Sequence, residues 1–218
     1  MSSSPSAAVP ARLILLSAPS GAGKTTLVRA LLEREPELRF SISFTTRKPR
    51  LNERDGEDYF FVSEAEFRQM VSDGEFLEYA RVFDNWYGTG REHVESLLAD
   101  GHCVLLEIDW QGAQQVRAAL EQVCSVFILP PSVAELERRL TGRASDSRSV
   151  IERRLRDALA DMSHWHEFEY AIINDDVDTA ADELLRIVRG QSVATATDNP
   201  ALIERIRAIV DTGPDDAS

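Results

Sequence analysis

The chain has 218 residues, of which 43% are hydrophobic, and this length is enough for one α/β domain with a sizeable core. Its formal net charge of -13 argues against non-specific binding to nucleic acid or to an anionic membrane, so a bound anion must be met by a local basic cluster. No apolar run approaches the roughly 20 residues that span a bilayer, and residues 1–10 lack the basic residues of a secretory signal, so we expect a cytoplasmic protein.

Short apolar runs alternate with helical patterns along the chain, which predicts a parallel sheet covered by helices on both faces. We expect residues 1–10 to form a tail, residues 11–190 to form the main domain, and residues 191–218 to form a linker and a final helix. The expected strands lie near 12–17, 40–45, 76–83, 103–108, 124–129 and 169–173. The expected helices lie near 24–35, 64–72, 91–100, 112–121, 133–141, 149–164 and 177–189.

The segment Ser17–Thr26 follows the first expected strand and opens the first expected helix. This context predicts a phosphate-binding loop, because glycines let the backbone pass close to phosphates and the amides at a helix start point at their oxygens. Lys24, one of only two lysines among 24 basic residues, would add a fixed positive charge, and Thr25 a hydroxyl ligand for Mg²⁺. Ala18 replaces the first glycine of the strict pattern, but the context favours a nucleoside triphosphate site over an ordinary glycine-rich turn.

The regular alternation is interrupted between Phe40 and about Gly90, where short antiparallel strands rich in aromatic and charged residues are expected as an insert on the edge of the main sheet. The run Arg47–Arg50 (Arg-Lys-Pro-Arg) contains a proline that favours an extended turn, from which both arginines could bind one small anion. Such a run is most often a solvated turn. A chain with a triphosphate loop needs an acceptor site, however, and the hydroxyls of Tyr59 and Tyr87 could complete it.

Two later segments each allow two interpretations. Residues 142–149 are small, polar and basic between two expected helices, which is typical of a mobile flap but also of a plain surface loop. The final helix carries an apolar side. This side either docks on the core or contacts another subunit, and in the second case the protein would be a homo-oligomer. The residues on this side are Leu202, Ile203, Ile206, Ile209 and Val210.

The motifs of the chain, taken together and in order, resemble the guanylate kinase family over about residues 11–190. The resemblance implies a P-loop three-layer α/β sandwich with a parallel core sheet, made of residues 11–39, 91–131 and 165–190. It further implies an inserted mixed β/α GMP-binding region at 40–90 and a helical lid at about 132–164. The segments that carry the resemblance are Ser17–Thr26, Ser41–Arg50, Gly56–Val62, Glu75–Ala80, Tyr87–Thr89, Glu107–Ala113, Leu129–Ser132, Leu140–Arg143 and Ile172–Asp176.

The resemblance implies an enzyme that moves the terminal phosphoryl group of ATP to GMP with Mg²⁺, giving ADP and GDP, and that also accepts dGMP. It places ATP-binding roles on Ser20, Gly21, Ala22, Gly23, Lys24, Thr25, Thr26 and Asn174. It places GMP-binding roles on Ser43, Glu78 and Thr89 for guanine, on Arg47, Arg50, Tyr59 and Tyr87 for the phosphate, and on Asp109. It makes Lys24, Arg47, Arg139, Arg143 and Arg154 catalytic, and Thr25 and Asp109 the residues nearest the metal, with Glu107 as a second acid.

Each assignment has a plainer alternative. A carboxylate such as Glu78 can accept both Watson–Crick hydrogens of guanine, N1–H and the 2-amino group, but the same residue could be an exposed acid on an edge strand. Asp109 could be merely a helix cap, and arginines on helices usually face solvent. For the whole chain, a phosphopeptide-binding module or a kinase for a sugar phosphate would be the competing functions. Lys24 argues against the first, and Glu78 with Ser43 and Thr89 against the second.

Overall fold

The computed structural model describes residues 12–82, 84–141, 148–191 and 193–211. The chain packs as two compact units. The first unit contains Leu16–Pro36 and the chain from Ser125 onward, and the second contains residues 12–15 and Glu37–Cys124. Each unit holds one group of the predicted site residues, so the two units are described separately.

The main sheet has five parallel strands in the order β2-β7-β1-β8-β9, as the alternation of apolar runs and helical patterns predicts. All five residues of β1 are buried, which is typical of a strand covered on both faces. In register, β2 pairs Phe40 with Leu105 of β7, and β8 pairs Ile128 with Ile172 of β9. The strands are β1 (Leu13–Ser17), β2 (Arg39–Ser41), β7 (Val104–Glu107), β8 (Val123–Leu129) and β9 (Tyr170–Ile173).

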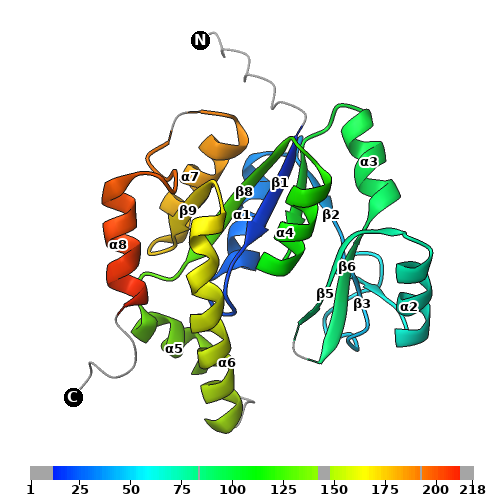
Figure 1. Cartoon of the computed structure of the whole chain (residues 1–218), viewed down its shortest axis with the longest axis horizontal. Helices are drawn as coiled ribbons and strands as arrows, with labels where there is room; N and C mark the ends of the chain where they lie inside the picture. Colours follow the sequence, from blue (N-terminus) through cyan, green and yellow to red (C-terminus); the bar gives the residue numbers. More distant parts are fainter. Residues whose placement is uncertain (1–11, 83, 142–147, 192, 212–218) are drawn as a thin grey trace. The chain divides into compact units, whose positions relative to one another are not determined.

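Helices of the first unit follow the expected boundaries to within about two residues (Figure 1). In this unit α1 packs against α7, where Arg34 reaches Asp178 at 2.6 Å and Asp182 at 2.8 Å, and α5 packs against α6. The elements are α1 (Lys24–Arg34), α5 (Val133–Thr141), α6 (Arg148–Met162), the 3₁₀ helix η1 (Ser163–Glu167), α7 (Val177–Val188) and α8 (Pro200–Val210).

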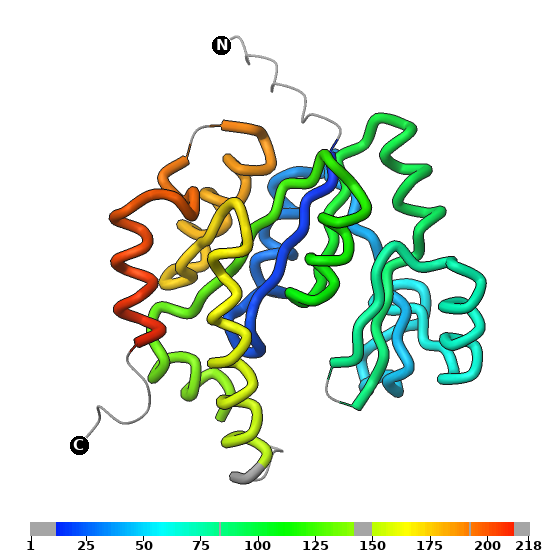
Figure 2. The backbone as a smooth tube through the Cα atoms, in the orientation of Figure 1, coloured from blue at the N-terminus to red at the C-terminus, as the bar shows by residue number. Residues whose placement is uncertain are grey.

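The last helix, α8, begins at Pro200 with Asn199 as its N-cap, whose side chain accepts a hydrogen bond from the amide of Ala201 at 3.0 Å. The red segment of Figure 2 traces this helix. Its residues Leu202, Ile206 and Ile209 are buried within the chain itself. Of the two expectations for this apolar side, docking on the chain's own core is therefore the one found.

The second unit carries a mixed sheet in the order β4-β3-β6-β5, together with three helices. The expected antiparallel pairing is found for β3–β6 and β5–β6, whereas β3 and β4 pair in parallel. The expected strand at 40–45 is also divided, since β2 joins the main sheet and β3 the mixed sheet. The elements are β3 (Phe44–Thr45), β4 (Phe60–Phe61), β5 (Phe76–Val82), β6 (Asn85–Gly90), α2 (Glu64–Ser72), α3 (Arg91–Ala99) and α4 (Trp110–Ala119).

Aromatic rings form a small separate core between the mixed sheet and α2. The ring of Phe67 stacks on Phe76 with centroids 4.5 Å apart and on Trp86 at 6.0 Å, and Phe44 lies 5.7 Å from Phe76. A Cβ at Gly88 would come within 2.9 Å of Phe76, so the rings use the space that this glycine leaves. The insert thus has an aromatic cluster of its own that packs its sheet against α2.

Both cysteines, Cys103 and Cys124, are buried, as an apolar role predicts. Within the ranges that the structure describes, no helix combines the length and the hydropathy needed to cross a membrane.

Candidate active site

The loop between β1 and α1 has the backbone of a phosphate-binding loop. Gly21 and Gly23 adopt φ values of 92° and 94°, which side chains with a Cβ rarely adopt. Gly23 is the N-cap of α1, and Lys24 is the first helical residue. The side chain of Lys24 is half-buried, and those of Thr25 and Thr26 are exposed. The first-turn amides of α1 and these side chains therefore lie together, which is the arrangement predicted for binding phosphates.

The loop is packed tightly on its far side by residues of the first unit. A Cβ at Gly21 would lie 3.0 Å from side-chain atoms of both Leu136 and Leu140 on α5. A Cβ at Gly23 would lie only 2.4 Å from Nδ2 of Asn174. Both positions thus require glycine for two reasons: the φ values are positive, and neighbouring side chains occupy the space that a Cβ would need.

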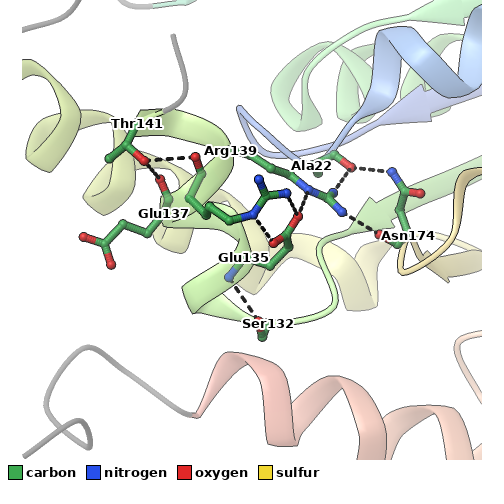
Figure 3. A network of polar contacts seen from close by, with 8 residues as sticks. Ala22, Ser132, Glu135, Glu137, Arg139, Thr141 and Asn174 are labelled. Atoms are coloured by element: carbon green, nitrogen blue, oxygen red, sulfur yellow. Dashed lines mark hydrogen bonds and ion pairs between the residues drawn. The ribbon is translucent and has the colours of Figure 1, made fainter. Parts of the chain in front are cut away.

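Asn174 and Arg139 meet at one carbonyl of this loop (Figure 3). Nδ2 of Asn174 donates to the carbonyl oxygen of Ala22 at 2.7 Å, and Nη1 of Arg139 donates to the same oxygen at 3.3 Å. Nη2 of Arg139 also donates to the carbonyl of Asn174 at 3.2 Å. Asn174 is only 1% exposed. Asn174 was predicted to bind ATP and Arg139 to be catalytic, and here both contact the backbone of the predicted phosphate-binding loop.

Arg139 is held in turn by Glu135, which lies one turn earlier on α5. Oε1 of Glu135 accepts from Nε of Arg139 at 2.7 Å, and the same carboxylate accepts two bonds from Arg138 at 2.6 and 2.7 Å. These hydrogen bonds lower the pKa of Glu135 to about 2. Sequence reasoning did not assign Glu135 to the site, although its i,i+3 and i,i+4 spacing to two arginines was a usable signal.

A second predicted arginine reaches the loop from α6. Nη2 of Arg154 donates to Oγ of Ser20 at 3.1 Å, so the structure brings this residue to the loop between β1 and α1. Arg143, the remaining arginine assigned to the lid, lies outside the described residues.

In the second unit, Arg47 forms a two-bond pair with a carboxylate that sequence reasoning missed. Nη1 and Nη2 of Arg47 donate to the two oxygens of Glu53 at 2.8 and 2.9 Å, and both side chains are 16% exposed. Hydrogen bonding to Glu53 raises the pKa of Arg47 and lowers that of Glu53. Glu53 also accepts from the backbone amide of Arg50 at 2.8 Å, so it organises the whole basic turn.

Two tyrosines complete this cluster. The guanidinium of Arg47 lies 5.2 Å from the ring centre of Tyr59, and the rings of Tyr59 and Tyr87 lie 6.0 Å apart. Burial raises the pKa of Tyr59, so its hydroxyl keeps its proton at neutral pH. The side chain of Arg50 is 68% exposed. The structure therefore groups all four predicted phosphate-contacting residues, with Glu53 as an added member.

Glu78 and Thr89 face each other across β5 and β6. The hydroxyl of Thr89 donates to Oε1 of Glu78 at 2.6 Å, and the two residues are 1% and 4% exposed. The alternative of an exposed edge acid is therefore wrong for Glu78. A Cβ at Gly112 would lie 2.3 Å from Oε2 of Glu78, so α4 closes over this carboxylate.

Asp109 stands at the start of α4, where it does serve as the N-cap. Its Oδ1 accepts from the amide of Gly112 at 2.7 Å. A Cβ on Gly112 would lie 3.2 Å from the same oxygen, so Asp109 and Glu78 share one small glycine as a neighbour. Ser43 lies between β2 and β3, and its carbonyl accepts from the amide of Phe60 at 3.0 Å. The three predicted guanine-reading residues thus come from three different segments of this unit, and Asp109 comes from a fourth.

A guanylate kinase family model matches residues 10–191. The chain is 54% identical over 197 residues to a guanylate kinase of Dechloromonas aromatica, covering 89% of this chain and 98% of the relative, and 49% identical over 201 residues to that of Escherichia coli K12, covering 90% and 97%. The chain belongs to the guanylate kinase family. The crystal structure of guanylate kinase from Anaplasma phagocytophilum is similar, with a TM-score of 0.72 and 34% identity over 92% of this chain and 96% of that one.

Guanylate kinases are ATP-dependent kinases that convert GMP to GDP, so family membership confirms the enzyme class and fold implied by the sequence motifs. Within the described residues, the two groups also match this chemistry. One contains helix-start backbone amides, Lys24 and arginines, and the other contains guanidinium, hydroxyl and carboxylate groups.

A cavity of about 350 Å³ lies in the first unit at α7 and α8, apart from these residues. Its lining includes Asp175, Asp176, Glu183 and Arg205, and none of the predicted site residues that the structure describes.

Proposed function

We propose that this guanylate kinase binds ATP at the loop between β1 and α1 and GMP at the residue group of the second unit. The terminal phosphoryl group of ATP would pass to a phosphate oxygen of GMP, giving ADP and GDP. The buried pair of Glu78 and Thr89 is the observation that carries the choice of GMP, because it places a carboxylate and a hydroxyl in a protected position.

The base is selected by hydrogen-bond complementarity. Guanine offers two adjacent donors, N1–H and the 2-amino group, to the carboxylate of Glu78, while the hydroxyl of Ser43 can donate to O6. The hydroxyl of Thr89 donates to Glu78 and so helps to orient this carboxylate. Adenine would place its bare N1 acceptor against the same carboxylate. Each mismatched buried polar group costs about 1–3 kcal/mol, so the site should favour GMP over AMP by one or more orders of magnitude.

The phosphate of GMP would be held by Arg47, Arg50, Tyr59 and Tyr87. Arg47 is already oriented by Glu53 and by the ring of Tyr59, so less conformational freedom is lost when the phosphate binds. The protonated hydroxyl of Tyr59 can donate to a phosphate oxygen. These groups would fix the attacking oxygen and reduce the repulsion between two anionic substrates.

The phosphates of ATP would be held by the loop amides and by Lys24, with Arg154 and Arg139 beside them. Charged donors that stabilise the transferring group can contribute about a thousand-fold or more to the rate. The exposed hydroxyl of Thr25 is an oxygen ligand of the kind that Mg²⁺ takes alongside substrate phosphates, so the loop fits Mg²⁺ as the cofactor. When bound, Mg²⁺ would neutralise charge on the phosphate oxygens.

The contacts proposed above involve the phosphate and the base of the acceptor and do not involve its ribose 2′-hydroxyl. We therefore expect dGMP to be a substrate as well. We further propose a cytoplasmic location, because ATP and GMP are cytoplasmic metabolites.

The test is a coupled assay of ADP release in which ATP and Mg²⁺ are offered with GMP, dGMP, AMP, UMP or ribose 5-phosphate. We expect turnover with GMP and dGMP and, as estimated above, at least about ten-fold lower kcat/KM with AMP. Equal turnover of AMP, or preferred turnover of the sugar phosphate, would show that Glu78 does not read guanine. Binding of nucleotides without any turnover would favour the binding-module alternative.

A further inference from the structure

The carbonyl of Ala22 is fixed in direction by two donors from elsewhere in the first unit. Nδ2 of Asn174 and Nη1 of Arg139 bind its oxygen at 2.7 and 3.3 Å, and together they can use both of its lone pairs. The peptide bond between Ala22 and Gly23 is trans, because no cis peptide bond occurs in the described chain. In a trans peptide the N–H points opposite to the C=O. The two donors therefore also fix the direction of the Gly23 amide.

This orientation matters for a loop that binds anions. Amides that face a phosphate attract it, whereas a carbonyl oxygen facing the same phosphate would repel it. Gly23 has a φ of 94°, and its lack of a side chain gives it more freedom to rotate than any other residue has. A loop of this kind needs an external contact to stay in one orientation.

Arg139 can provide that contact only if its own guanidinium group is held in one orientation. The group is planar and rigid, so fixing Nε also sets the directions of Nη1 and Nη2. Oε1 of Glu135 accepts from Nε at 2.7 Å, while Nη1 and Nη2 reach the carbonyls of Ala22 and Asn174 (Figure 3). The side chains of Glu135 and Arg139 are 24% and 22% exposed, against 73% for Arg138.

We propose that Glu135 is a positioning residue of the ATP site, which acts through Arg139 to keep the Ala22 carbonyl turned away from the phosphates. The inference rests on the proposed assignment of the loop to ATP. Glu135 itself need not touch either nucleotide. Arg138, the other partner of this carboxylate, is mostly exposed. The contacts from Glu135 to the loop run through Arg139 and do not include Arg138.

The experiment compares Glu135→Ala and Glu135→Gln with the unmodified chain, using kinetics in which ATP and GMP are varied separately. Loss of a hydrogen bond between charged groups corresponds to about ten-fold or more in binding, so Glu135→Ala should raise the KM for ATP by about ten-fold. The KM for GMP should stay within about two-fold. Glu135→Gln keeps an oxygen that can accept from Nε of Arg139, and should recover much of the loss.

Two further variants separate positioning from a general effect on α5. Glu137→Ala removes a carboxylate from the same helix, and Arg138→Ala removes the competing partner of Glu135. Both should leave the KM for ATP within about two-fold of the unmodified value. A ten-fold rise in Arg138→Ala, or equal effects of Glu135→Ala and Glu137→Ala, would overturn the proposal.

A calorimetric titration with ADP alone makes the result independent of the acceptor. We expect Glu135→Ala to weaken ADP binding by a factor similar to the change in the KM for ATP, with a melting temperature that shows a folded protein. If Glu135→Ala melts at room temperature, Glu135→Gln provides the same comparison. Unchanged ADP binding in a folded variant would refute the role of Glu135. Absence of GMP phosphorylation by the unmodified chain would instead refute the proposed function.

Discussion

The proposed ATP loop of the first unit and the proposed GMP residues of the second unit would recognise their ligands in two different ways. The loop relies on backbone: two glycines with positive φ, helix-start amides, and a carbonyl that is held by Asn174 and Arg139. The second group relies on side chains that pair with one another, Arg47 with Glu53 and Glu78 with Thr89. Backbone amides read charge and little else, whereas paired side chains can read the edge of one base.

This difference predicts how the two regions respond to substitution. Changes in the loop should reduce the transfer of phosphate from ATP to any acceptor. Changes at Glu78 should instead alter the choice among acceptors. Three experiments sharpen the comparison, and they are given from the largest expected effect to the smallest.

Lys24→Met should lower kcat by about a thousand-fold, because it removes the fixed positive charge beside the transferring phosphate and supplies no replacement. The variant should still fold, because Lys24 is not part of the buried core. Its kcat is measured in the coupled assay and its fold by thermal unfolding. The matched control is Lys48→Met, because Lys48 is the only other lysine and is exposed. Near-normal turnover in a folded Lys24→Met variant would mean that the loop is not the donor site.

Glu78→Gln should reduce kcat/KM for GMP by about ten- to a hundred-fold, because the amide can accept only one of the two guanine hydrogens. The KM for ATP should change much less. Steady-state kinetics with each substrate varied would measure both. Glu75→Gln removes an exposed carboxylate just before the same strand and controls for the loss of charge. Equal losses for ATP and GMP would remove Glu78 from the guanine site.

Gly23→Ala should destabilise the chain more than Gly101→Ala. Both glycines have positive φ, 94° and 84°, so both variants incur backbone strain of about 1–3 kcal/mol. Only at Gly23 would the new Cβ also meet Asn174, at 2.4 Å, whereas nothing lies within 4 Å of it at Gly101. Urea unfolding of the two variants measures the difference in free energy. Equal destabilisation would show that Asn174 moves aside without cost, and would weaken the backbone side of the comparison.

Local signals in the sequence predicted most helices and strands accurately. The boundaries of α1, α2 and α5 depend on apolar spacing and on residues next to the helix, and such signals are complete within a dozen residues. The division of residues 40–45 between two sheets could not be read in this way. Arg39–Ser41 and Phe44–Thr45 lie in one continuous stretch of alternating polar and apolar residues, and only their partners, β7 and β6, place them in different sheets.

The candidate site shows the same division. Motif residues such as Lys24, Arg47 and Glu78 were found because each residue type fits a chemical role at a recognisable place in the chain. The contacts that support these residues were not predicted from the sequence. Glu53, Glu135 and the carbonyl of Ala22 make these contacts, but the sequence around each of them has no motif that indicates a site.

The sequence by itself determined the order of strands and helices, the phosphate loop and the family to which the chain belongs. These follow from short-range patterns of glycine, charge and apolar spacing. Only the tertiary structure decided that Asn174 lies against a loop 152 positions earlier in the chain, that Glu78 is buried beneath Gly112, and that α8 docks on its own unit. Such contacts depend on packing between distant segments, and packing depends on shape in three dimensions, which no local pattern encodes.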